Sequence, residues 1–179
     1  PYDATIEFIS VEGDLKESVL HLPKMNADYR ATMIQSGQIL HWDNDGKEAD
    51  VDIAEPTGWL CEPDSSILRA SLVQHLAQPL NGTMLDTTIA YFCTQNHPES
   101  HWVRAWKIRE WMPFNLKKLR ARLRQMDVGT LTVKKRGSPI TPEELIRKLK
   151  LKGSQSATVI LTRYAEMPIA IICDDILAV

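Results

Sequence analysis

Residues 113–137 read PFNLKKLRARLRQMDVGTLTVKKRG, and this stretch decides the fold. Leu116, Leu119 and Leu123 recur every three or four residues, which is the spacing of a helix with one apolar face. Asn115 stands just before them and can cap the helix. The pattern predicts a helix over 115–126, followed after Gly129 by a strand over 130–135. A helix that leads through a glycine into a strand indicates a helix packed on a sheet.

The segments on either side continue this alternation. A strand is predicted over 102–110, before the helix. Downstream, Thr141-Pro-Glu-Glu144 combines a hydroxyl cap, a first-turn proline and a third-position glutamate, which predicts a helix that ends near Leu151 with Gly153 as its stop. Two strands, 157–163 and 169–173, complete a β-α-β-α-β-β order with helices on one face of a mixed sheet.

The first part of the chain shows a different pattern. Short apolar runs separated by turns at Gly13-Asp14 and Ser36-Gly37 predict an N-terminal antiparallel β-meander over residues 1–57, although a short helix within 15–22 competes with a strand there. Residues 58–100 are predicted to hold a helix over 62–79 and a connector, and 101–179 form the last unit. The predicted fold class is α+β.

Charge is divided unevenly along the chain. Residues 1–99 hold 5 Lys and Arg against 16 Asp and Glu, a net charge of −11, while residues 100–179 hold 16 against 7, a net charge of +9. Between Arg104 and Lys152 there are 15 basic and 4 acidic residues. Such a block favours a surface that faces a polyanion such as a phosphate backbone. The competing interpretation is a solvated pair of helices balanced by acidic neighbours.

On the predicted helix the leucines and Met126 face the sheet, so the basic residues fall on its two flanks. Like charges at this spacing repel, and a sequence that tolerates the repulsion can use it to bind an anion. Backbone N–H groups near Gly137 could add contacts. The residues predicted to contact phosphates are Lys117, Lys118, Arg120, Arg124, Lys134, Lys135 and Arg136. The second helix, which carries Arg147, Lys148, Lys150 and Lys152, is expected to be a solvated face.

Aromatic residues beside this block could stack unpaired bases. Trp106 is expected in the core, since large aromatic side chains are usually buried. For Trp102 and Trp111 the sequence leaves stacking and core burial equally open, and Phe114 is a further candidate.

The sequence predicts no catalytic or metal site. Its eight glycines never fall two apart, which excludes a dinucleotide-binding fingerprint and a Walker loop. The acidic segment 43–55 departs from the calcium-loop pattern at Lys47 and Ala49. Cys61, Cys93 and Cys173 are expected to be buried hydrophobes in a reducing, cytoplasmic setting. No apolar run approaches a membrane span, and no signal peptide is recognised.

Several stretches resemble the C-terminal, THUMP-like region of bacterial class I S-adenosylmethionine-dependent methyltransferases. The most specific are Pro113-Phe-Asn-Leu-Lys-Lys118 and Thr132-Val-Lys-Lys-Arg-Gly137, with Trp59 to Asp64 and Ala157 to Thr162 in support. In that family the methyltransferase domain lies upstream and has a glycine-rich cofactor loop. The resemblance implies an accessory region without a cofactor of its own, with S-adenosylmethionine bound by the upstream domain. It also implies tRNA or rRNA as a partner.

Together these patterns predict an RNA-binding accessory region of an RNA methyltransferase. The alternative is a protein–protein or intramolecular docking module in which the basic half meets the acidic half or a further domain. Charge reversal at Arg120 and Arg124 is expected to destabilise the fold under docking and to leave stability nearly unchanged under RNA binding. A free-standing enzyme is the weakest reading, because candidate catalytic residues are missing.

Overall fold

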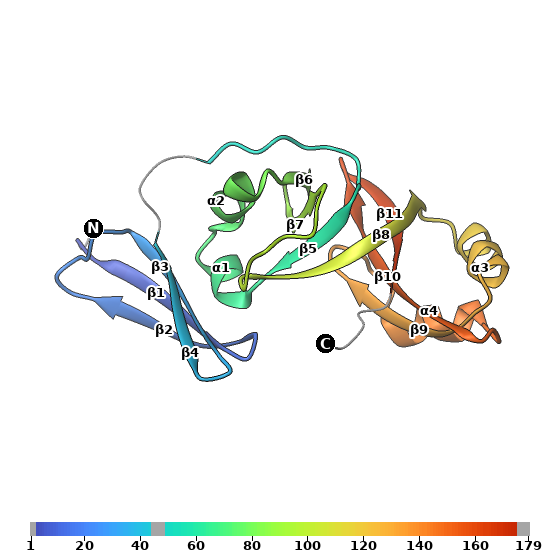
Figure 1. Ribbon diagram of the computed structural model, residues 1–179, viewed down its shortest axis with the longest axis horizontal. Helices are drawn as coiled ribbons and strands as arrows, with labels where there is room; N and C mark the ends of the chain where they lie inside the picture. The colour runs from blue at the N-terminus through green and yellow to red at the C-terminus, as the bar shows by residue number, and fades with distance from the viewer. Residues whose placement is uncertain (1–2, 44–48, 175–179) are drawn as a thin grey trace.

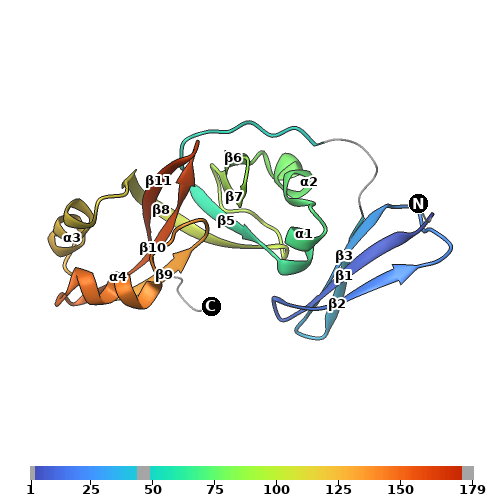
Figure 2. The ribbon, with the colours of Figure 1, turned by 180° about the vertical axis from the view of Figure 1, so that it is seen from behind.

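A computed structural model describes residues 3–43 and 49–174, and it contains two β-sheets and four α-helices within these ranges. A four-stranded sheet lies at one end of an elongated molecule, and helices α3 and α4 lie at the other end (Figure 1). Between them, a seven-stranded sheet has the strand order β6-β7-β5-β8-β11-β10-β9. The view from behind shows the same arrangement (Figure 2).

The small sheet has the order β2-β1-β3-β4, and its strands are β1 (Thr5–Val11), β2 (Asp14–His21), β3 (Tyr29–Gln35) and β4 (Gln38–Asp43). The segment 15–22 is therefore a strand and not a helix. The predicted antiparallel meander is wrong in topology, because β3 pairs with β1, in parallel, and does not pair with β2. The buried Thr5 hydroxyl accepts a hydrogen bond from Met25 N at 2.9 Å and donates one to the Ala27 carbonyl. These two bonds hold residues 25–27, which lead into β3, beside the start of β1. Turn spacing and alternation do not encode this pairing order.

The middle segment contributes three strands and two short helices. They are β5 (Trp59–Pro63), α1 (Ser65–Arg69), α2 (Val73–Ala77), the 3-10 turn η1 (Gln78–Leu80), β6 (Thr83–Asp86) and β7 (Ile89–Thr94). The continuous helix expected over 62–79 is thus wrong. Residues 59–63 pair with β7 and β8, and Ser71, at φ +59°, separates α1 from α2. The expected cap is present, since Asp64 accepts a hydrogen bond from Ser66 N at 2.9 Å.

The last unit confirms the predicted β-α-β-α-β-β order and the α+β class. Its elements are β8 (Val103–Pro113), α3 (Leu116–Gln125), β9 (Val128–Lys135), α4 (Pro142–Leu149), β10 (Gln155–Tyr164) and β11 (Met167–Cys173). The sheet is mixed, because β9 and β10 are parallel while β10–β11 and β11–β8 are antiparallel. The first half of the long strand β8 pairs with β5 and its second half with β11, which joins the two parts of the sheet.

Helices α3 and α4 cover one face of this sheet. Their buried residues Leu119, Leu123, Leu145 and Leu149 pack on apolar residues of β10 and β11. Gly153 is not the stop of α4, which ends at Lys150 with φ +49°. Gly153 instead allows a backbone crossing, since a Cβ there would lie 2.0 Å from the Asp127 carbonyl oxygen.

The small sheet packs on α1 and on the start of β8. Ala31 and Met33 share a buried cluster with Ile67, and the rings of Trp42 and Trp102 meet edge to face at 6.1 Å. Residues 44–48, which belong to the acidic segment, lie outside the described residues. In the described ranges no helix has the length and apolar character of a membrane span.

Candidate nucleic-acid interface

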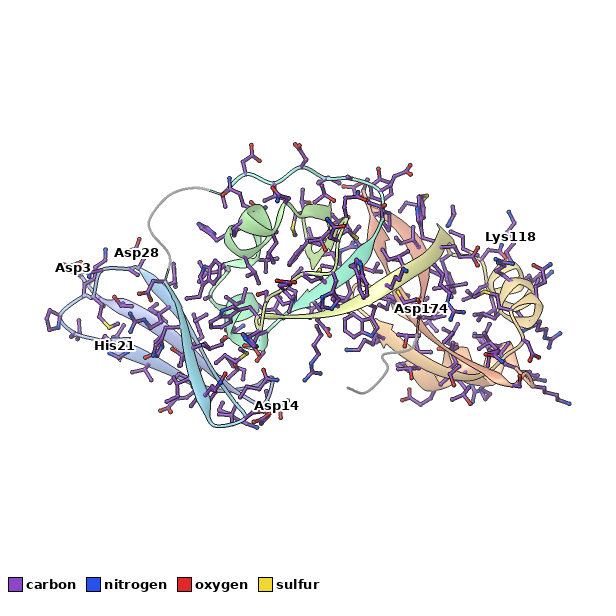
Figure 3. All side chains as sticks on the ribbon, in the orientation of Figure 1. Asp3, Asp14, His21, Asp28, Lys118 and Asp174 are labelled. Carbon is purple, nitrogen blue, oxygen red and sulfur yellow. The ribbon has the colours of Figure 1, made fainter. Side chains whose placement is uncertain are left out.

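The basic residues of α3 are positioned by its cap and its apolar stripe. The Asn115 side chain accepts hydrogen bonds from Lys117 N and Lys118 N at 3.0 and 3.1 Å, which fixes the first turn. Because Leu119 and Leu123 are fully buried, Lys117, Lys118 and Arg124 are left exposed. Lys118 lies at the outer end of the molecule, far from Asp14 of the small sheet (Figure 3).

Two of the predicted phosphate contacts also have a role within the fold. Arg120 donates a hydrogen bond to the Lys148 carbonyl, and Arg124 Nη2 lies 3.3 Å from the Lys150 carbonyl oxygen. Both carbonyls belong to the C-terminal end of α4, where the helix dipole favours positive charge. These two arginines therefore help to hold α3 against α4, which the repulsion argument from sequence did not anticipate.

The contact between α3 and α4 also brings together lysines that were expected from the sequence to be only solvated. Arg124, Lys150 and Lys152 line an open cleft of about 500 Å³ together with Asp127 and backbone around Gly153. The expectation that the basic residues of α4 form only a solvated face missed this grouping. The signal that could have found it is the loop 150–153, which returns the chain to the end of α3.

The three basic residues at the end of β9 do not share one face of the sheet. Leu131 and Val133 pack in the cluster with the helices, and Lys135 follows them at the two-residue period of a strand. Lys134 points to the opposite face, where its Nζ lies 4.4 Å from the centre of the Trp106 ring.

Lys134 and Arg136 are bound to a carboxylate from the acidic half. Lys134 Nζ lies 2.7 Å from Glu62 Oε2, and Arg136 Nη2 lies 3.9 Å from Glu62 Oε1. Arg136 also lies over the Tyr91 ring at 5.3 Å. The seven predicted residues are thus split. Five lie on the helix side of the sheet, and Lys134 and Arg136 lie on the other, because strand alternation separates neighbours and Glu62 arrives from a distant strand.

Two of the four aromatic candidates are buried, and the other two are half-buried in packing contacts. Trp106 is 2% exposed, which confirms that it lies in the core. Trp102 is 7% exposed, so of the two alternatives left open by the sequence, core burial is the one that holds. The half-buried Trp111 meets Tyr164 edge to face at 5.7 Å, and Phe114 packs beside the helices. These four side chains therefore serve packing in this arrangement.

Other reactive groups are also held in the interior. Cys61, Cys93 and Cys173 are free and buried, as expected. Burial raises the pKa of Cys61 to about 11 and that of Cys93 to about 12, so both thiols are protonated at neutral pH. Among the described residues, no group of three His, Cys, Asp or Glu side chains is placed to hold a metal ion.

Comparison with known families bears directly on the unit built by β8 to β11. The family model described as THUMP domain-like matches residues 103–175. These residues are a THUMP-like domain. Its boundaries coincide with the β-α-β-α-β-β unit, so the resemblance seen in the sequence is confirmed.

Relatives of the chain carry methyltransferase names. It is 29% identical over 165 residues to an "uncharacterized S-adenosylmethionine-dependent methyltransferase" of Mycobacterium tuberculosis, found alike in strains CDC 1551 / Oshkosh and H37Rv. The alignment covers 90% of this chain and 45% of the relative, so the chain spans less than half of the relative's length.

A solved structure shares the fold beyond the THUMP-like domain. The crystal structure of a "putative methyltransferase" from Porphyromonas gingivalis W83 matches with a TM-score of 0.75 at 16% identity, over 96% of this chain and 45% of that chain. The combination of small sheet, middle segment and THUMP-like domain therefore recurs in another protein.

Proposed function

We propose that this chain is the RNA-binding accessory region of a bacterial S-adenosylmethionine-dependent RNA methyltransferase. The methyltransferase names of the relatives support the enzyme class, and the THUMP-like domain supports an RNA-directed role. The chain matches less than half of those relatives, and we assign S-adenosylmethionine binding and catalysis to the part of such proteins that lies beyond this match. The free, buried cysteines support a cytoplasmic setting.

The observation that carries the proposal is a group of cations on the helix side of the THUMP-like domain. We call it the helix-side surface, and it consists of Lys117, Lys118, Arg120, Arg124, Lys135, Lys150 and Lys152. Within the part of the chain that the structure describes, none of the seven forms an ion pair with a carboxylate. By contrast, Arg122 and Lys148 are paired with Glu110 and Glu144. Uncompensated cations on one side of a domain attract a phosphate backbone.

The surface suits backbone contacts more than base recognition. The nearby aromatic rings are engaged in packing, so stacking on open rings does not contribute. We therefore expect binding that depends on RNA charge and shape, with tRNA or rRNA as the natural substrates, and only weak preference for base sequence.

Filter binding of a structured RNA tests the proposal with matched variants. Lys117→Glu combined with Lys152→Glu reverses two charges of the helix-side surface, neither of which makes a hydrogen bond through its side chain among the described residues. Lys16→Glu combined with Lys107→Glu changes the net charge equally on exposed positions of β2 and β8. The first pair is expected to weaken binding at least tenfold more than the second. Equal losses in both pairs would contradict a localised interface.

Docking of a methyltransferase domain on the same surface is the second candidate, and the greater length of the relatives favours it. Charge reversal at Arg120 and Arg124, which the sequence suggested as a test, does not distinguish RNA binding from docking. Both side chains hold α4, so their reversal costs stability in either case. The Lys117 and Lys152 pair avoids this problem. Unchanged RNA binding together with lost association of a separately expressed methyltransferase domain would favour docking.

A further inference from the structure

A second basic site lies where the small sheet meets the THUMP-like domain. A cleft of about 310 Å³ opens between the β1–β2 turn, the end of β3, residues 62–65, the start of β8 and the end of β9. Its charged side chains are Glu62, Asp64, Arg104, Lys134 and Arg136. The turn closes tightly on the cleft, since a Cβ on Gly13 would lie 2.9 Å from Arg104 Nη2. Lys134 faces away from the helices here, so the cleft is separate from the helix-side surface.

The positive charge of this cleft exceeds what its own carboxylates neutralise. Asp64 Oδ1 already accepts hydrogen bonds from the Ser10 hydroxyl at 2.6 Å, from Ser66 N at 2.9 Å and from the Ser66 hydroxyl at 2.6 Å. Glu62 is shared between Lys134 and Arg136. Arg104 is exposed and forms no ion pair with any residue that the structure describes. Three cations therefore face two carboxylates, and Arg104 is left without a carboxylate partner among the described residues.

Two of these cations are held in position before any ligand arrives. Lys134 lies over Trp106 and Arg136 over Tyr91, and both rings are buried. Fixed side chains lose little conformational freedom on binding, which favours affinity for a small anion. The volume of the cleft is at the lower end of the range of about 300–1,000 Å³ for ligand pockets, so it suits one nucleotide and excludes a duplex.

We propose that this cleft binds a single nucleotide through its phosphate group, with Arg104, Lys134 and Arg136 as the phosphate ligands. The nucleotide is either free or an unpaired residue of an RNA strand. Glu62 competes with the phosphate for Lys134 and Arg136, so it limits the affinity of the site. This inference goes beyond the proposed function, because it concerns the opposite side of the sheet and holds even if the helix-side surface binds no RNA.

Titration with adenosine 5′-monophosphate, followed by two-dimensional ¹H–¹⁵N NMR of the full chain, tests the site directly. Saturable shifts are expected at the amides of Glu62, Asp64 and Ser65 and of residues 102–104 and 134–136, and adenosine without phosphate is expected to give none. Arg104→Ala should weaken binding about tenfold, the scale of one charge-assisted hydrogen bond. Lys107→Ala, the matched control on the same strand, should leave it unchanged.

The Glu62→Gln variant gives the most specific test, because it removes a carboxylate and is expected to tighten binding several-fold. Weaker binding in this variant would overturn the role of Glu62, and shifts confined to the helix-side surface or absent at millimolar nucleotide would overturn the site. A single-stranded five-nucleotide RNA then separates the sources. Tighter binding of this RNA than of the mononucleotide, followed at the amides of the cleft, assigns the cleft to an RNA strand, and equal or weaker binding there assigns it to a free nucleotide.

Discussion

Glu62 of β5 and Lys134 of β9 are 72 residues apart in the chain, and their side chains form an ion pair with an Oε2–Nζ distance of 2.7 Å. Glu62 comes from the acidic half and Lys134 from the basic half, so this contact neutralises part of the charge division seen in the sequence. The neutralisation is local. Arg136 shares the same carboxylate, whereas the helix-side surface keeps its charge.

The Glu62–Lys134 pair is expected to contribute measurably to stability. Both side chains are mostly buried, so Glu62→Gln should lower the free energy of unfolding by about 1–2 kcal/mol, between the values typical of exposed and of fully buried pairs. Urea denaturation of both single variants and of Glu62→Gln with Lys134→Met forms a double-mutant cycle. We expect a coupling energy of about 1 kcal/mol. Strictly additive effects would show that the pair adds nothing to the fold.

Gly153 is expected to be intolerant of any side chain. A Cβ at this position would lie 2.0 Å from the Asp127 carbonyl oxygen, which is backbone and cannot move aside alone. Gly153→Ala should therefore cost about 3 kcal/mol or more of unfolding free energy. Gly37→Ala is the control, because it adds a Cβ in open space at φ +77° and should cost only about 1 kcal/mol. Similar thermal midpoints for the two variants would contradict the close crossing.

Glu7 makes the stability of the small sheet sensitive to acid. Burial raises the pKa of Glu7, but hydrogen bonds from Thr32 and His21, with the charges of His21 and Arg30, outweigh it and hold the pKa below the ordinary 4.5. Since the folded pKa is below that of the unfolded chain, the carboxylate stabilises the fold above about pH 4.5, and this contribution is lost as pH falls through the folded pKa.

Wild-type protein should therefore lose more stability than Glu7→Gln when urea denaturation is compared at about pH 5 and about pH 3. Glu17→Gln, an exposed carboxylate on the neighbouring strand β2, provides the control and should follow the wild type. Parallel acid dependence of wild type and Glu7→Gln would refute this role of Glu7.

The three cysteines should resist thiol reagents in the native protein. Burial raises the pKa of each thiol, so the reactive thiolate is scarce and access is blocked. Mass spectrometry after iodoacetamide treatment at about pH 8 should show no labelled cysteine in native protein and three in urea. Rapid native labelling of any of them would indicate an opening that the structure does not contain.

Local patterns predicted the THUMP-like domain well. The Asn115 and Thr141 caps and the leucine stripes fixed α3 and α4, because caps and amphipathic spacing act within a few residues. The resemblance of residues 113–137 to a known family was likewise confirmed.

Long-range arrangements were the part that the sequence did not reveal. The parallel pairing of β1 with β3, the strand at 59–63 and the Gly129–Gly153 crossing all depend on partners far along the chain. The division of the predicted phosphate contacts between two faces of the sheet likewise depends on the fold. Lys134 and Lys135 are neighbours in sequence, but strand alternation sends them to opposite faces, and only the fold brings Glu62 to one of them.

The salt dependence of RNA binding tests the central claim most directly. Of the seven residues predicted from sequence, Lys117, Lys118, Arg120, Arg124 and Lys135 remain without a carboxylate partner among the described residues. Five phosphate contacts predict that the logarithm of the association constant falls with the logarithm of salt concentration at a slope of roughly −3.5 to −4.5. A slope in this range, reduced by roughly 1–2 in the Lys117→Glu and Lys152→Glu double variant, is the expected result. A flat response, or a slope that this variant leaves unchanged, would contradict RNA binding by the helix-side surface.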